Sequence, residues 1–120
     1  MRDNLSYMTE NPPLTEEEYE AIEKVRVIMS EQKIVPCTGC HYCVTENACP
    51  MNILIPEVIR SYNMRKLFED WSQIRYYNAV LTKENGKASD CIECGMCEAV
   101  CPQQLEIRSV LKDVAELFEK

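Results

Sequence analysis

Apolar residues recur every three or four positions along much of this chain, which is the spacing of one face of an α-helix. The first such segment follows Pro13, and its apolar positions are Tyr19, Ile22, Val25, Ile28 and Met29. Thr15 and Glu18 form a capping-box pattern at its start, in which the hydroxyl accepts a backbone N–H and the carboxylate reaches back. We therefore predict a helix from about Glu16 to Gln32.

Further helices are predicted downstream. One begins at Pro56, because a proline at the first helical position loses no hydrogen bond, and its apolar face comprises Val58, Ile59, Tyr62 and Leu67. Another ends before the turn signal Asn85-Gly86 and carries Trp71, Ile74, Tyr77, Ala79 and Val80. The last has the clearest amphipathic pattern, formed by Ile107, Val110, Leu111, Val114, Leu117 and Phe118. No segment alternates as a half-buried strand does, so an all-α fold is expected.

Length and composition indicate one small domain. The chain has 120 residues, of which 46% are hydrophobic. Residues 1–13 are polar and end in Asn11-Pro12-Pro13, so we expect a linker or an arm there and a folded domain over residues 14–120. No apolar run is long enough for a signal peptide or a membrane span. We therefore expect a cytoplasmic protein, in which cysteines serve as thiolate ligands more often than as disulfides.

The negative net charge of the chain limits the classes of partner that it can bind. A formal charge of −7 argues against nucleic acid as a partner, since no cluster of Lys and Arg is available to neutralise phosphates. An acidic surface suits solubility and a basic protein partner.

The eight cysteines form an internal repeat. Each copy has three cysteines at two-residue intervals and a fourth before a proline: Cys37, Cys40, Cys43 and Cys49 in the first, and Cys91, Cys94, Cys97 and Cys101 in the second. A helix is expected after each copy, so the domain should consist of two pseudo-symmetric halves. Five residues separate the third and fourth cysteines in the first copy and three in the second, which leaves the direction of Cys49 less well defined by the pattern.

The second copy has the spacing of bacterial ferredoxins, in which three thiolates take three irons of one [4Fe–4S] cluster and the fourth reaches the other cluster. Transferred to this chain, the pattern predicts two [4Fe–4S] clusters. The ligands of cluster 1 would be Cys37, Cys40, Cys43 and Cys101, and those of cluster 2 would be Cys91, Cys94, Cys97 and Cys49.

Other roles for these cysteines account for fewer features of the cysteine pattern. Cys37-Thr-Gly-Cys40-His41 matches the attachment motif of haem c, but a haem site has no need of the cysteines that follow. A zinc-stabilised structural or interaction domain without redox role is the main alternative. Four-cysteine zinc sites do not account for the third cysteine and the distant Cys-Pro, which occur in both repeats. Clusters that serve structure alone are a further alternative.

Few residues other than the cysteines are candidates for a role in binding or catalysis. His41 is expected to be a loop residue near a cluster rather than a ligand, and Gly95 to permit close approach of the backbone. No catalytic residue is assigned in this chain. Six apolar residues are expected to line the cluster cavities: Tyr42, Met51, Ile53, Ile92, Met96 and Leu105.

The whole chain resembles the C-terminal iron–sulfur domain of a bacterial and archaeal branch of the aldo/keto reductase family. The resembling segments are Leu14-Thr-Glu-Glu-Glu-Tyr19, Ile34-Val-Pro-Cys-Thr-Gly-Cys-His-Tyr-Cys43, Cys49-Pro-Met-Asn-Ile-Leu-Ile-Pro56, Lys87-Ala-Ser-Asp-Cys-Ile-Glu-Cys-Gly-Met-Cys97 and Cys101-Pro-Gln-Gln-Leu-Glu-Ile-Arg108. The resemblance implies an α-helical ferredoxin-like fold that follows a (β/α)8 barrel, for which residues 1–13 would be the link. None of the family's Asp, Tyr, Lys and His active site maps onto this chain.

The resemblance also implies a function. The chain would be an electron-transfer domain with two [4Fe–4S] clusters, the C-terminal part of an oxidoreductase of the aldo/keto reductase type. Its partners would be the upstream barrel and a redox protein or small molecule that donates or accepts electrons, with neither nucleic acid nor a membrane span involved.

Overall fold

The computed structural model describes residues 13–32, 34–45 and 49–120, and the chain divides into two compact units. Unit 1 is Met1–Lys33 and unit 2 is Ile34–Lys120. Almost all of the predicted linker, residues 1–12, lies outside the described residues, so the linker stays a prediction.

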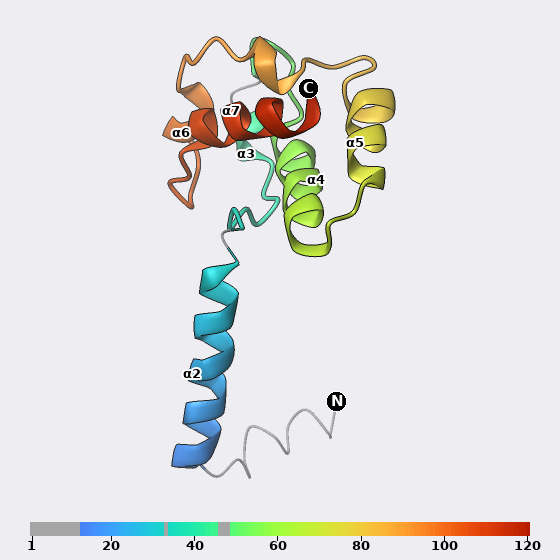
Figure 1. Ribbon diagram of the computed structural model, residues 1–120. Helices are drawn as coiled ribbons and strands as arrows, with labels where there is room; N and C mark the ends of the chain where they lie inside the picture. Colours follow the sequence, from blue (N-terminus) through green and yellow to red (C-terminus); the bar gives the residue numbers. More distant parts are fainter. Residues whose placement is uncertain (1–12, 33, 46–48) are drawn as a thin grey trace, which may run out of the picture. The chain divides into compact units, whose positions relative to one another are not determined.

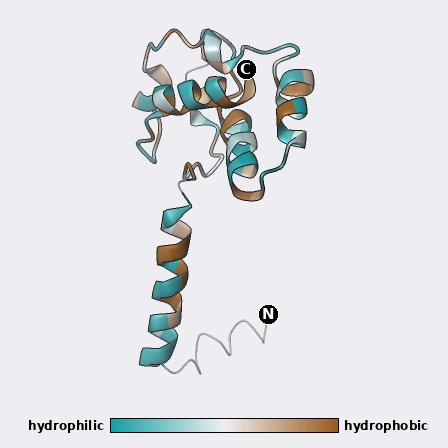
Figure 2. Ribbon diagram, viewed as in Figure 1, coloured by the Kyte–Doolittle hydropathy of each residue, from teal (hydrophilic) through white to brown (hydrophobic). Residues whose placement is uncertain are grey.

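The described residues of unit 1, residues 13–32, contain one helix, α2, over Glu16–Glu31. The predicted capping box is present: the Glu18 N–H donates to the Thr15 hydroxyl at 3.3 Å, and the Thr15 N–H donates to the Glu18 carboxylate at 2.8 Å. Apolar and polar residues alternate along α2 (Figure 2), and none of them is buried. The sequence therefore predicted this helix and its first turn correctly.

Unit 2 is helical, and the residues that the structure describes include no strand, which confirms the all-α prediction. The longer helices are α4 and α7. Helix α7 runs across α4, and α5 lies beside α4 (Figure 1). The helices of unit 2 are α3 (Tyr42–Thr45), α4 (Ile55–Phe68), α5 (Ser72–Tyr76), the π-helix η1 (Tyr77–Leu81), the 3-10 helix η2 (Ala88–Asp90), α6 (Met96–Ala99) and α7 (Ile107–Phe118).

The core of unit 2 forms where α4 and α7 meet. The sequence predicted most of the residues that α4 and α7 bury: Val58, Ile59 and Tyr62 from α4, and Ile107, Leu111, Val114 and Phe118 from α7. Burial of each such side chain contributes about 1.5–3 kcal/mol. Leu67 was expected on the same face of α4 but is 37% exposed, so that expectation was wrong.

The segment between α4 and η2 also differs from its prediction. The single helix expected there begins only at Ser72, because Asp70 accepts the Ser72 N–H at 2.9 Å and keeps Trp71 in the preceding turn, where it is 70% exposed. The helix then widens into a π turn, in which the Thr82 N–H donates to the Tyr77 carbonyl at 3.0 Å. Leu81 is buried there, whereas Val80 is exposed.

Tyr77 is the polar centre of this core. Its ring packs edge-on against Phe118, with ring centroids 5.1 Å apart. The hydroxyl donates to Glu119 and accepts the Ala88 N–H at 2.7 Å. Burial, more than any other factor, raises the pKa of Tyr77, so the phenol stays neutral. Tyr77 thus joins η1, α7 and the segment that leads to Cys91.

Candidate metal centre

The eight cysteines lie around two cavities in unit 2. The first cavity is lined by Cys37, Cys40, Cys43 and Cys101, and the second by Cys91, Cys94, Cys97 and Cys49. Each repeat therefore contributes three cysteines to one cavity and its fourth cysteine to the other, as the ferredoxin pattern predicts.

Each cysteine loop has two left-handed residues at equivalent positions. In the first loop they are Gly39 (φ 67°) and His41 (φ 66°), and in the second they are Glu93 (φ 56°) and Gly95 (φ 75°). Such turns expose successive backbone N–H groups on their concave side, which is a common setting for iron–sulfur clusters. The strained φ values at the two residues that are not glycine indicate that the loop shape is imposed by its surroundings.

The third cysteine of each loop is the second residue of a short helix. Cys43 lies in α3 and Cys97 in α6, and these two helices contact each other. Desolvation by burial raises the pKa of both thiols to about 11. Both are therefore neutral at pH 7 when no metal is bound, and a metal must displace their protons to bind. Cys40 and Cys94, by contrast, are exposed.

The fourth cysteine of each repeat is aimed by a repeated turn. The Asn52 N–H donates to the Cys49 carbonyl at 2.8 Å, and the Gln104 N–H donates to the Cys101 carbonyl at 3.0 Å. Asn52 and Gln104 share the left-handed conformation, with φ of 53° and 51°. Cys49 thus reaches the second cavity despite the longer spacing before it, part of which, residues 46–48, lies outside the described residues.

The walls of the two cavities are only partly as expected. Met51, Ile92 and Met96 line the second cavity and Leu105 lines the first, as predicted. Two predictions were wrong. Ile53 is fully buried in the core instead, because it precedes α4, and Tyr42 is 47% exposed at the start of α3.

His41 lines the first cavity as a loop residue. Its Nε2 lies 3.8 Å from a carboxylate oxygen of Glu57 on α4. The other oxygen of Glu57 is buried and has no hydrogen-bond partner among the described residues.

Arg108 is a residue of the site that the sequence reasoning missed. It lines the second cavity near the start of α7, and its guanidinium carbon lies 3.9 Å from where a Cβ on Gly95 would be. Its Nε donates to Glu98 at 2.9 Å, and its backbone N–H donates to the other oxygen of Glu98 at 2.8 Å. A comparison of the two repeats could have found it, because Ile107-Arg108 stands where the first repeat has Ile55-Pro56.

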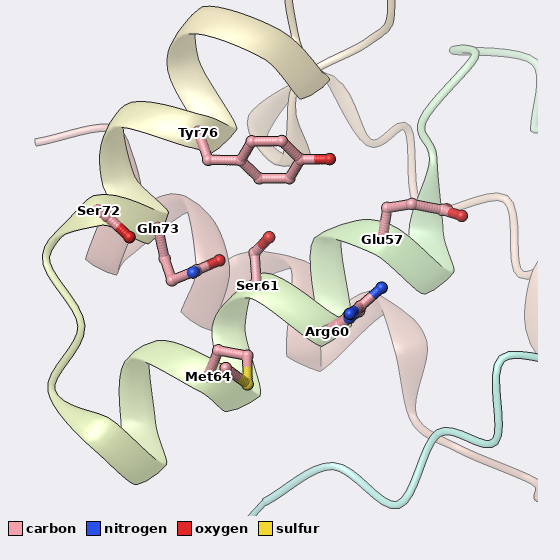
Figure 3. Close-up of a pocket in the computed structure, with 7 residues that line it drawn as sticks. All are labelled: Glu57, Arg60, Ser61, Met64, Ser72, Gln73 and Tyr76. Carbon is pink, nitrogen blue, oxygen red and sulfur yellow. The ribbon is translucent and has the colours of Figure 1, made fainter.

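A wider cleft of about 470 Å³ lies between α4 and α5, away from the cysteines. Figure 3 shows Glu57, Arg60, Ser61 and Met64 on α4 facing Ser72, Gln73 and Tyr76 on α5. The cleft has no cysteine in its wall, so it is separate from the two thiol cavities.

Over residues 13–32, 34–45 and 49–120, no three His, Cys, Asp or Glu side chains converge on a site for one metal ion. Within the same ranges, the structure contains no helix whose length and apolar character would let it cross a membrane.

Comparison with known proteins identifies the family. Residues 36–106 match the model of a family described as a 4Fe-4S dicluster domain, and the chain belongs to this family. Neither the curated proteins nor the solved structures include a match. The donor set fits the cofactor, because each cavity has four thiols for the four irons of one cluster. The chain is thus an iron–sulfur domain for two [4Fe–4S] clusters, with a role in electron transfer.

Proposed function

We propose that the eight cysteines are the cluster ligands and that each repeat serves both clusters. Cluster 1 is held by Cys37, Cys40, Cys43 and Cys101, and cluster 2 by Cys91, Cys94, Cys97 and Cys49. The observation that carries this proposal is the grouping of the thiols around two cavities, each with one cysteine from the other repeat.

The residues of the chain have separate tasks in this proposal. When bound, the clusters supply one-electron redox chemistry. Cys43 and Cys97 anchor the clusters inside the domain, where apolar neighbours exclude water. Backbone N–H groups of the left-handed loops would stabilise the negative charge of a bound cluster. Cys40 and Cys94 lie at the surface, where their ligation would bring each cluster within reach of an electron partner.

Serine substitution of four cysteines tests the partition. We expect Cys94→Ser and Cys49→Ser to perturb the same reduction wave, since both remove a ligand of cluster 2, although the two cysteines come from different repeats. Cys40→Ser and Cys101→Ser should perturb the other wave. Protein-film voltammetry and EPR of anaerobic protein measure both waves in each variant, and the four variants serve as controls for one another.

The opposite pairing would contradict the partition. If Cys49→Ser behaved like Cys40→Ser, each repeat would hold its own cluster. If no variant changed the bound iron or the two waves, the ligand assignment itself would be wrong.

The proposal extends to the protein in which this domain works. The resemblance of the cysteine segments supports an oxidoreductase of the aldo/keto reductase type, with a barrel before this domain and a redox protein or small molecule as electron partner, in the cytoplasm. An antibody raised against this chain should then detect a larger protein in the source cells, since such a barrel adds about 250 residues. A band at 13.9 kDa, the mass of this chain alone, would contradict the extension.

Structural clusters form the second candidate function. Cys43 and Cys97 belong to the buried core, so clusters bound to them could also stabilise the fold. Clusters that keep their absorption spectrum unchanged on addition of dithionite would favour this candidate over electron transfer.

A further inference from the structure

The two cavities differ in charge although they are built from the same repeat. Arg108 lines the second cavity, and Pro56, at the equivalent position of the other repeat, lines the first. Among the lining residues of both cavities that the structure describes, Arg108 is the one with a permanent charge. At this pair of matched positions the second repeat has a cation where the first has a neutral residue, and its counter-ion Glu98 stands where the first repeat has Val44.

Arg108 and its counter-ion both lie close to the thiols of the second cavity. Glu98 accepts hydrogen bonds from Arg108 and does not line the cavity, but it follows Cys97 directly in the chain. The two charges therefore act in opposite directions on the site, and Arg108 offsets Glu98.

The surroundings of the first cavity act in the other direction. Glu57 pairs with His41, and one of its oxygens is buried without a partner. The polar groups in the wall of this cavity, such as Thr38 and Gln103, are neutral. Their dipoles act over a shorter range than the full charge of Arg108.

We propose that Arg108 raises the potential of cluster 2 and offsets the opposite effect of Glu98, the residue that follows Cys97. This inference rests on the proposed assignment of the cysteines. A reduced cluster carries one more negative charge than an oxidised cluster, so a nearby cation stabilises the reduced form. When one electron moves from cluster 1 to cluster 2, cluster 1 is oxidised, cluster 2 is reduced and no proton is transferred. Arg108 is a positioning residue for the electron and does not bind iron.

Two substitutions with opposite expected effects test the proposal. Arg108→Gln should lower the potential of cluster 2 and decrease the equilibrium constant for electron transfer from cluster 1 to cluster 2 about tenfold, which is about 59 mV for a one-electron couple. Glu98→Gln should raise the same potential, because it leaves Arg108 without its counter-ion while an amide oxygen can still accept the backbone N–H. A purely structural role for the ion pair would give shifts in the same direction.

Controls separate the charge from other effects. Arg108→Lys retains the cation and should restore most of the potential. Lys112→Gln removes a cation one turn further along α7, where Lys112 pairs with Glu93 at 2.9 Å outside the cavity, and should shift the potential less than Arg108→Gln does. Both potentials are measured by EPR-monitored redox titration, and Cys94→Ser identifies the signal of cluster 2.

The outcomes distinguish this inference from the proposed function. Normal iron content with unchanged potentials in Arg108→Gln, or equal shifts of both clusters, would overturn the inference alone. A wild-type chain without iron would overturn the proposed function and the inference with it. If Arg108→Gln lost iron, Glu98→Gln would decide, since a rise in the potential of cluster 2 supports the inference and a fall or no change overturns it.

Discussion

At the scale of single residues, Gly86 connects a turn to the cluster ligands. Its N–H donates to the carbonyl of Asn52 at 3.0 Å, and Asn52 also donates through its side chain to Asn85. These contacts hold the segment that follows Cys49. The sequence predicted the turn at Asn85-Gly86 but not its contact with this segment, because the contact joins positions more than thirty residues apart.

Gly86→Ala should therefore weaken the domain. A Cβ on Gly86 would clash with the backbone carbonyl oxygen of Met51, so the backbone must shift. Overpacking of this kind costs about 1–3 kcal/mol of unfolding free energy. Anaerobic urea unfolding of the cluster-loaded chain, followed by far-UV circular dichroism, measures the loss. Lys83→Ala, at an exposed position of the same segment, is the control, and equal stability of the two variants would contradict the account.

At the scale of helices, periodicity predicted α2, α4 and α7 well because each has a long amphipathic pattern. It predicted the region of α5 and η1 poorly. Ala79, Val80 and Leu81 are consecutive apolar residues, so the pattern does not indicate which of them faces inward. The π turn there depends on tertiary contacts of Tyr77, which local sequence does not encode.

Tyr77→Phe tests the importance of that connection between helices. The substitution keeps the packing against Phe118 but removes the acceptor of the Ala88 N–H and the donor to Glu119. A buried N–H without a partner costs about 1–3 kcal/mol. The same urea unfolding should show this loss, whereas Tyr76→Phe, at an exposed tyrosine of α5, should change stability little. No difference between the two variants would mean that water satisfies the Ala88 N–H.

At the scale of the whole molecule, the cysteine repeat predicted two [4Fe–4S] clusters and periodicity predicted an all-α fold, and both predictions are confirmed. The structure groups the thiols around two cavities, and the assignment of each thiol to a cluster stays a prediction. The division at Lys33 and the role of Arg108 were not predicted. The division at Lys33 depends on contacts between residues that are distant in the sequence. Arg108 stands out only when the two repeats are compared position by position.

The central claim is that this chain carries two [4Fe–4S] clusters that exchange electrons. The most direct measurement is iron, acid-labile sulfide and zinc analysis of anaerobically purified chain, together with its absorption spectrum before and after dithionite. The account predicts about eight irons and eight sulfides per chain, and a band near ~400 nm that bleaches on reduction. About two zincs per chain and no such band, after anaerobic reconstitution has also failed, would contradict it.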